Sequence, residues 1–268
     1  ESLFVSKARI MESLFATAER LSVSTPEKIK VEEYKERLKK EAEELVLHKF
    51  PEKILELELL LKTEKFSKAD LTTVHTEVNI PVPEVPNILN HEGDLPVAKK
   101  RRLDALENDI TGTKVLVLPN GSVPTNTHII SMVDIVKPKI WQLVEDTNIL
   151  KMWVQFLIPR IEDGNNFGVS IQEDALTEIR AVEGEAAAFF DQISRYFLTR
   201  GKIIAKVAKY PHVDDFRRTV QELDEKQYVS LRLVVCELKN HYATLHDLIT
   251  KNLEKIKRPR SSNVENMY

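Results

Sequence analysis

Few side chains in this sequence have the spacing that catalysis or metal binding requires. His241 and His246 are five residues apart, so on a helix they would not share a face as a pair of metal ligands does. Cys236 lies in an apolar helical stretch without a neighbouring histidine, which favours a buried, unreactive thiol over a nucleophile. We therefore expect no catalytic residue, no metal site and no cofactor.

Motifs of the common catalytic and nucleotide-binding sites are also missing from the chain. No G-x-S-x-G, P-loop, G-x-G-x-x-G or H-E-x-x-H pattern occurs. Glu162, Asp163, Asn165 and Asn166 carry the oxygen atoms of a calcium site, but the D-x-D-x-D-G spacing of such a loop is absent. The sequence therefore favours recognition over catalysis, and we predict that the protein is not an enzyme.

The segment that stands out is 159–168, with the sequence PRIEDGNNFG. Gly164 and Gly168 permit a positive φ, and asparagine tolerates it next best, so the segment can hold one defined loop with free side-chain amides. A plain connection between helices needs only a few residues and seldom needs an aromatic anchor such as Phe167. From the residues alone, a docking loop and a structural turn both remain open.

Two further segments have the composition of recognition motifs. Lys99, Lys100, Arg101 and Arg102 form a dense basic cluster in a proline-rich stretch, which suits an exposed nuclear import signal; a solvated charge run is the alternative. Residues 260–268 have no helical pattern and end in Met267 and Tyr268. A terminal carboxylate beside an apolar and an aromatic side chain suits insertion into a pocket with a cationic floor, and terminal fraying is the alternative.

The elements around these segments are amphipathic helices, because apolar residues recur at a spacing of three to four. Helical pattern covers 26–66, where Pro51 should kink the helix, and 127–157, where Pro138 is a second, tolerated kink. It also covers 169–210 and 213–256, each predicting a helix of up to about 45 residues and roughly 65 Å. Residues 67–126 hold six of the twelve prolines and predict a flexible insert or linker. Two short connections and one long one predict an all-α, elongated four-helix bundle over 28–268, after a poorly ordered N-terminal extension over 1–27.

Composition limits the function further. The net charge of −3 argues against a nucleic-acid binder, and no apolar run approaches the roughly 18 residues of a membrane span. One cysteine cannot form a disulfide within the chain and suits a reducing compartment. Apolar residues outside the main stripes, such as Phe189 and Val235, predict more apolar surface than one bundle buries. We expect a soluble intracellular protein that associates with other chains.

The segment 159–168 resembles the activation loop of the 11S (REG) proteasome activator family. Further similarity lies in Trp153-Val154-Gln155, Ile80-Pro81-Val82-Pro83, Lys209-Tyr210-Pro211-His212-Val213 and Lys257-Arg258-Pro259-Arg260-Ser261-Ser262. The resemblance covers about residues 28–268 and is closest from Lys151 onward. The basic cluster and the Lys-Arg-Pro-Arg-Ser-Ser tail resemble the gamma branch, which is nuclear and homomeric.

This resemblance implies a homoheptameric ring that caps the core proteasome on its outer alpha ring and opens the axial gate without ATP. It assigns the activation loop to Arg160, Ile161, Glu162, Asp163, Gly164, Asn165, Asn166, Phe167 and Gly168, and attachment to the tail ending in Met267 and Tyr268. Asn165 is the expected centre of the loop. The alternative is a nuclear four-helix adaptor that binds partner proteins and has no proteasome role.

Overall fold

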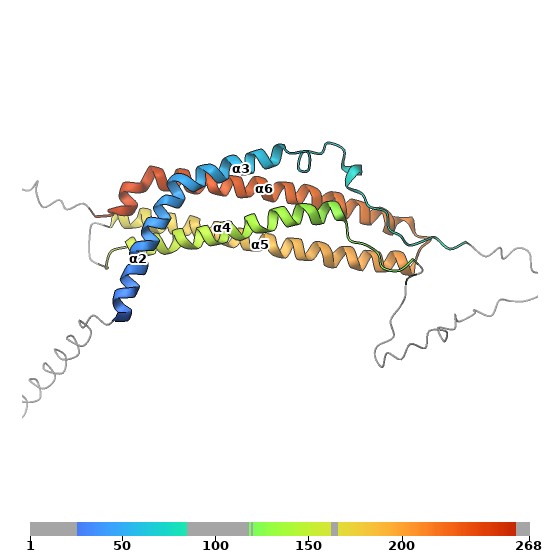
Figure 1. Ribbon diagram of the computed structural model, residues 1–268, viewed down its shortest axis with the longest axis horizontal. Helices are drawn as coiled ribbons and strands as arrows, with labels where there is room; N and C mark the ends of the chain where they lie inside the picture. Colours follow the sequence, from blue (N-terminus) through green and yellow to red (C-terminus); the bar gives the residue numbers. More distant parts are fainter. Residues whose placement is uncertain (1–25, 85–117, 119, 162–165, 261–268) are drawn as a thin grey trace, which may run out of the picture. The chain divides into compact units, whose positions relative to one another are not determined.

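The computed structural model describes residues 26–84, 118, 120–161 and 166–260, and these residues are helical with irregular connections and no strand (Figure 1). The elements in chain order are α2 (Pro26–Glu44), η1 (Leu45–Lys49), α3 (Phe50–Lys62), η2 (Leu71–Val74), α4 (Thr127–Leu157), α5 (Phe167–Lys209) and α6 (Asp214–Lys257). The predicted all-α class is confirmed. Two of the predicted long helices, α5 and α6, have 43 and 44 residues.

The first helical region is interrupted where Pro51 was expected to disturb it. Proline has no N–H, and its ring collides with the carbonyl group four residues earlier, here that of Leu47. The chain responds with the π-helical turn η1, in which the Phe50 N–H donates to the Leu45 carbonyl oxygen five residues back. Proline then occupies the second position of α3, where a missing N–H has no consequence.

The chain divides into two compact units, and the three long helices each contribute to both. Unit 1 contains α2, η1 and most of α3, the part of α4 from Pro138, α5 up to Ala188 and α6 from Val235. Within unit 1 the ring of Phe50 on α3 contacts that of Tyr242 on α6, with centroids 4.9 Å apart. Lys151 on α4 pairs with Glu183 on α5 at 2.6 Å. Four helical stretches therefore pack together in this unit.

Unit 2 contains Lys62–Lys137 and Phe189–Val234, so it combines three helical stretches with irregular chain on either side of residues 85–117. Its apolar cluster of Ile80, Val207 and Val220 joins the irregular chain to α5 and α6. The helix α4 begins at a defined cap, because the Asn126 Oδ1 accepts from the backbone N–H groups of His128 and Ile129 at 3.0 and 3.2 Å.

The structure differs from the predicted flexible linker at both of its ends. Residues 67–84 and 120–126 are packed: Val74 and Ile80 are buried, and the Asn79 amide donates to the Asn120 and Ser122 carbonyl oxygens. Proline-rich composition predicted the lack of long helix there, but it did not reveal that extended chain can fill the space beside three helices. Residues 85–117 and 119, in the middle of that prediction, lie outside the described residues, as does nearly all of the predicted extension 1–27.

In the described part of the chain, no helix is long and apolar enough to span a membrane.

Candidate functional site

The candidate loop connects α4, which ends at Leu157, to α5, which begins at Phe167. Arg160, Ile161 and Asn166 are exposed, whereas Glu162, Asp163, Gly164 and Asn165 lie outside the described residues. The sequence assigned the loop to 160–168, but Phe167 and Gly168 belong to the first turn of α5. Two of the nine predicted loop residues are therefore helical.

Phe167 does not act as the anchor that the sequence suggested. Its side chain is 73% exposed, and Ile161 on the other side of the loop is fully exposed. Neither side chain is packed inside the described part of the chain, so both are available for contact with a partner.

Gly168 is required for a different reason from the one the sequence suggested. Positive φ was the expected reason, yet among the described glycines only Gly121 has it, at 75°. Gly168 is buried, and a Cβ atom added there would lie 2.0 Å from the carbonyl oxygen of Pro259. Pro259 is the second residue after the end of α6. The first turn of α5 and the base of the C-terminal tail are therefore in direct backbone contact.

Gln172, one turn further along α5, links the same parts of unit 1. Its side chain is fully buried, and Nε2 donates to the Leu157 carbonyl oxygen at 3.1 Å and to that of Ile256 at 2.8 Å. The last carbonyl groups of a helix have no partner within the helix, so Gln172 satisfies one orphan acceptor of α4 and one of α6. A usable signal was present in the sequence, because a polar residue interrupts the apolar stripe of α5.

The tail base has one further contact with the loop. Arg260 Nη2 donates to Asn166 Oδ1 at 3.3 Å. Met267 and Tyr268, the predicted attachment residues, lie outside the described residues, and so does the basic cluster Lys99–Arg102. The structure thus brings together the ends of the loop and the start of the tail, two segments that the sequence assigned to separate roles.

A second polar centre, in unit 2, is the buried carboxylate of Asp224. Its Oδ1 accepts from the Tyr196 hydroxyl at 2.7 Å and from Arg200 Nε at 2.9 Å, and its Oδ2 accepts from the Asn126 amide at 2.8 Å. Burial, and then the charge of Asp224, raise the pKa of Tyr196 above its usual range. We call these four residues the Asp224 hub.

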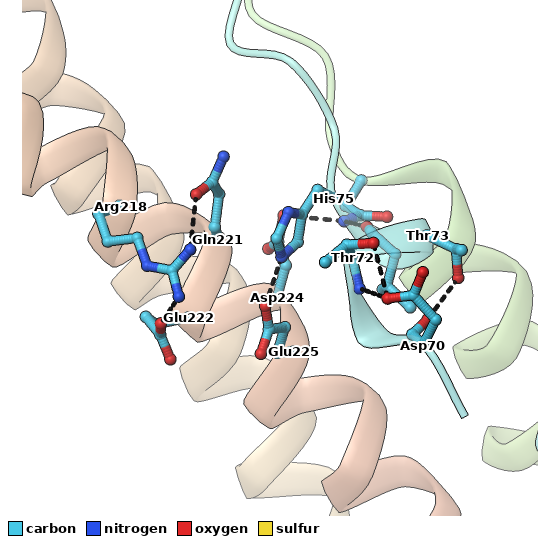
Figure 2. A network of polar contacts seen from close by, with 11 residues as sticks. Asp70, Thr72, Thr73, His75, Arg218, Gln221, Glu222, Asp224 and Glu225 are labelled. Atoms are coloured by element: carbon cyan, nitrogen blue, oxygen red, sulfur yellow. Dashed lines mark hydrogen bonds and ion pairs between the residues drawn. The ribbon is translucent and has the colours of Figure 1, made fainter. Parts of the chain in front are cut away.

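The Asp224 hub holds the irregular chain of unit 2 against the helices. Arg200 donates to the Pro124 carbonyl oxygen at 3.3 Å and to the Thr76 hydroxyl at 3.1 Å, while the Asn126 amide also donates to the Val74 carbonyl oxygen at 2.8 Å. Figure 2 shows Asp224 beside this chain. Every hydrogen bond of the hub serves packing, which assigns it a structural role.

Nearby in unit 2, the carboxylate of Asp70 caps the short helix η2. It accepts from the Thr72 hydroxyl at 2.7 Å and from the Thr72 N–H at 3.0 Å, and these bonds hold the pKa of Asp70 below its usual value (Figure 2). One residue after η2, His75 Nε2 pairs with Glu225 of α6. These polar contacts again fasten irregular chain rather than form a reactive site.

The residues first considered for chemistry remain apart. His241 Nε2 lies 3.3 Å from Glu185 Oε2. The free Cys236 is half-buried rather than buried as predicted. No group of three or more potential metal ligands occurs among the described residues.

Apolar surface is present, although not all of it lies where the sequence placed it. Val235 is fully buried within its own chain and Phe189 is half-buried. Exposed apolar side chains on the helices include instead Leu47, Leu55, Leu59, Trp141, Leu198, Val229 and Leu233. Such rows of apolar residues on several helices suit contacts with further chains.

Comparison with known proteins accounts for most of the chain. The family described as Proteasome activator PA28, N-terminal, matches residues 25–85, and the family described as Proteasome activator PA28, C-terminal, matches residues 122–266. Proteasome activator complex subunit 3 of Homo sapiens is 55% identical over 250 residues, which are 92% of this chain and 98% of that protein. Proteasome activator complex subunit 2 of Homo sapiens is 38% identical over 238 residues, 89% of this chain and 93% of that protein.

A solved structure shows the same fold. The 11S subunit of the Plasmodium falciparum proteasome, PA28, superposes with a TM-score of 0.69 and 29% sequence identity, covering 89% of this chain and 97% of that chain. The two family matches leave out the stretch between residues 85 and 122, which is where the structure also stops describing a continuous chain.

Proposed function

Because the chain belongs to the PA28 proteasome activator family, we propose that it caps the core proteasome and stimulates peptide hydrolysis without ATP and without catalytic chemistry of its own. The chain is more similar to subunit 3 than to subunit 2, at 55% against 38% identity. The observation that carries the proposal is the meeting of the loop ends and the tail base in unit 1, with Ile161 and Phe167 exposed beside them.

The loop and the tail divide the work between gating and attachment. The tail, ending in Met267 and Tyr268, docks in pockets of the proteasome's outer ring, and several tails acting together multiply a weak contact. The loop 160–168, with Asn165 at its centre, favours the open arrangement of the entrance. It can do so only by interacting differently with the open and closed states.

Stimulated hydrolysis of a small fluorogenic peptide by purified core proteasome tests this division. Deleting residues 260–268 should abolish both binding and stimulation. Asn165→Tyr should keep binding, lose stimulation and compete with the unmodified protein. Full stimulation by the truncated chain would exclude a role of the tail in attachment. Full stimulation by Asn165→Tyr would show that the loop only connects two helices.

Assembly into a ring of seven identical chains is part of the proposal. Its support is the exposed apolar row on η1 and α3, formed by Leu47, Leu55 and Leu59, which a neighbouring chain would cover. Light scattering at micromolar concentration and moderate salt should give a mass of seven chains. A mass of one or two chains would contradict the ring and favour the adaptor alternative.

Nuclear import through Lys99–Arg102 completes the proposal and is supported by the composition of that cluster. Replacing these four residues by alanine should move the protein to the cytoplasm while its mass in solution stays the same. Unchanged nuclear retention would mean that the cluster is only a solvated charge run or that a second signal exists.

A further inference from the structure

The chain leaves α4 at the start of the loop and leaves α6 at the start of the tail. Both of these departure points are hydrogen-bonded to the same turn of α5. The loop leaves α4 after Leu157, and the tail leaves α6 after Lys257. Gln172 bonds the Leu157 carbonyl group at the first departure and the Ile256 carbonyl group at the second. One buried amide therefore holds both departure points at hydrogen-bonding distance from α5.

Gly168 lies at the other end of the loop and packs closely against the base of the tail. Ordinary contacts of a Cβ atom begin near 3.4 Å, whereas a Cβ atom on Gly168 would approach the Pro259 oxygen to 2.0 Å and its carbonyl carbon to 2.6 Å. The obstructing atoms are backbone, so no rotation of a side chain can relieve the overlap. Any larger residue at position 168 must displace the base of the tail from the first turn of α5.

We propose that Gly168 and Gln172 are positioning residues that set the spacing between the ends of the loop and the base of the tail. This inference rests on the proposed function, in which tail and loop contact one proteasome surface at the same time. With the spacing fixed, docking of the tail delivers the loop to the gate without a further loss of conformational freedom. With the spacing altered, the tail still docks, but the loop arrives displaced.

A matched pair of glycine substitutions on α5 tests the role of Gly168. Gly168→Ala introduces the overlap with Pro259, whereas Gly184→Ala adds the same methyl group to the same helix with nothing within 4 Å. Both changes replace a glycine of α5 by a residue that favours helix, and only Gly168→Ala creates an overlap with Pro259. Two quantities are measured: binding to immobilised core proteasome and stimulation of peptide hydrolysis at a saturating concentration of activator.

Gly184→Ala should bind and stimulate like the unmodified protein. Gly168→Ala should bind within about threefold of it, yet lose on the order of tenfold or more of the maximal stimulation, since a small misplacement of a working group costs rate. A change that merely destabilised the fold would reduce the amount of competent protein, and it would not lower stimulation at saturation. Equal stimulation by both alanine variants would overturn the inference and leave the proposed function standing.

A second matched pair tests the hydrogen bonds of Gln172. It also keeps the inference testable if Gly168→Ala fails to fold. Gln172→Met keeps the length of the side chain and removes both donors, while Gln192→Met makes the same change at an exposed position of α5. The same split between binding and stimulation is expected for Gln172→Met alone. Joint loss of binding and stimulation would contradict a positioning role, because the junction would then be needed for attachment itself.

A spectroscopic readout separates this inference from the proposed function. Spin labels at Ile161→Cys and Arg258→Cys, in a Cys236→Ser background diluted with unlabelled chain, report the distance between the loop and the tail base. Gly168→Ala should shift or broaden this distance and Gly184→Ala should not, whether or not the protein acts on a proteasome. Identical distances would overturn the inference, whereas absence of stimulation by the unmodified protein would overturn the proposed function.

Discussion

Each of the two compact units buries one aspartate that accepts a tyrosine hydroxyl, and the two differ in their other partners. Asp146 in unit 1 is 2% exposed and accepts from the Tyr242 hydroxyl at 2.7 Å and the Gln142 amide at 2.8 Å. Asp224 in unit 2 accepts from a tyrosine at the same distance, but it also binds the guanidinium of Arg200. One buried carboxylate is thus held by two neutral donors and the other by a counter-charge.

The difference follows from what each unit has to hold together. In unit 1 both donors to Asp146 come from long helices, whose backbone groups are already paired within the helix. In unit 2 irregular chain runs beside the helices, and its carbonyl groups need donors from elsewhere. Arg200 and Asn126 supply these donors to the carbonyl groups of Pro124 and Val74 while they bind Asp224. The charged hub of unit 2 therefore lies where irregular backbone is held by side chains.

Removing Arg200 should have the largest effect on stability. Arg200→Met leaves the Asp224 charge buried without its cation, and breaking a buried pair from one side costs about 3–5 kcal/mol. Urea unfolding at one fixed protein concentration measures the loss. Arg218→Met removes an exposed pair with Glu222 on α6 and should cost less than about 1 kcal/mol. Equal losses would show that the hub's charge has no special importance.

Replacing Asn126 should cause the next largest loss of stability, because its side chain both caps α4 and belongs to the Asp224 hub. Asn126→Ala removes the cap of α4 and the donor to Val74 and Asp224, for a combined loss of about 2–3 kcal/mol. Asn148→Ala, at an exposed position within α4, should be neutral or slightly stabilising since alanine is the better helix former. A loss of stability below about 0.5 kcal/mol for Asn126→Ala would show that Asn126 does not hold the irregular chain as proposed.

The two tyrosines allow the most direct comparison of the units. Tyr242→Phe should cost about 2 kcal/mol, because Asp146 is then left with a single neutral donor among the described residues. Tyr196→Phe should cost about 1 kcal/mol, because Asp224 keeps Arg200 and Asn126. Both are measured by urea unfolding at neutral pH. The reverse order would mean that the counter-charge does not compensate for a lost hydroxyl.

Alkaline pH should give the smallest effect per residue. Burial, followed by the neighbouring aspartate, raises the pKa of Tyr196 and of Tyr242 above the ordinary value of 10.0. The unfolded chain therefore loses these protons first, so their contribution is complete below pH 10 and declines above it. At pH 10.5 each tyrosine should account for less than about 1 kcal/mol of lost stability. The double phenylalanine variant should show a correspondingly flatter decline above pH 10 than the unmodified protein, and an equal decline would contradict the assignment.

Helices were predictable from sequence because their pattern repeats over many turns. Apolar spacing in α5 and α6, the asparagine before α4 and the effect of Pro51 all follow from local rules. The packing of 67–84 was not predictable in this way. Val74 and Ile80 become buried through contacts with helices far along the chain, and composition favoured a loose linker there.

Much the same limit applies to the candidate site. The sequence identified the loop and the tail as separate segments from their composition and from a family resemblance. It gave the wrong reason for Gly168, because a close approach by Pro259 leaves no trace in the residues around position 168. Gln172 and Asp224 could have been found, since a polar residue inside an apolar stripe indicates a buried partner, but only the fold shows which partner.

The contact between Asn79 and the backbone at Asn120 and Ser122 should allow the residues between Pro83 and Leu118 to be exchanged for another segment. The two ends of this stretch are held side by side by ordered chain, so the helices do not depend on how many residues connect them. Doubling the length of a flexible loop adds only about 0.6 kcal/mol of closure entropy. A foreign domain grafted between Pro83 and Leu118 should therefore leave both units folded.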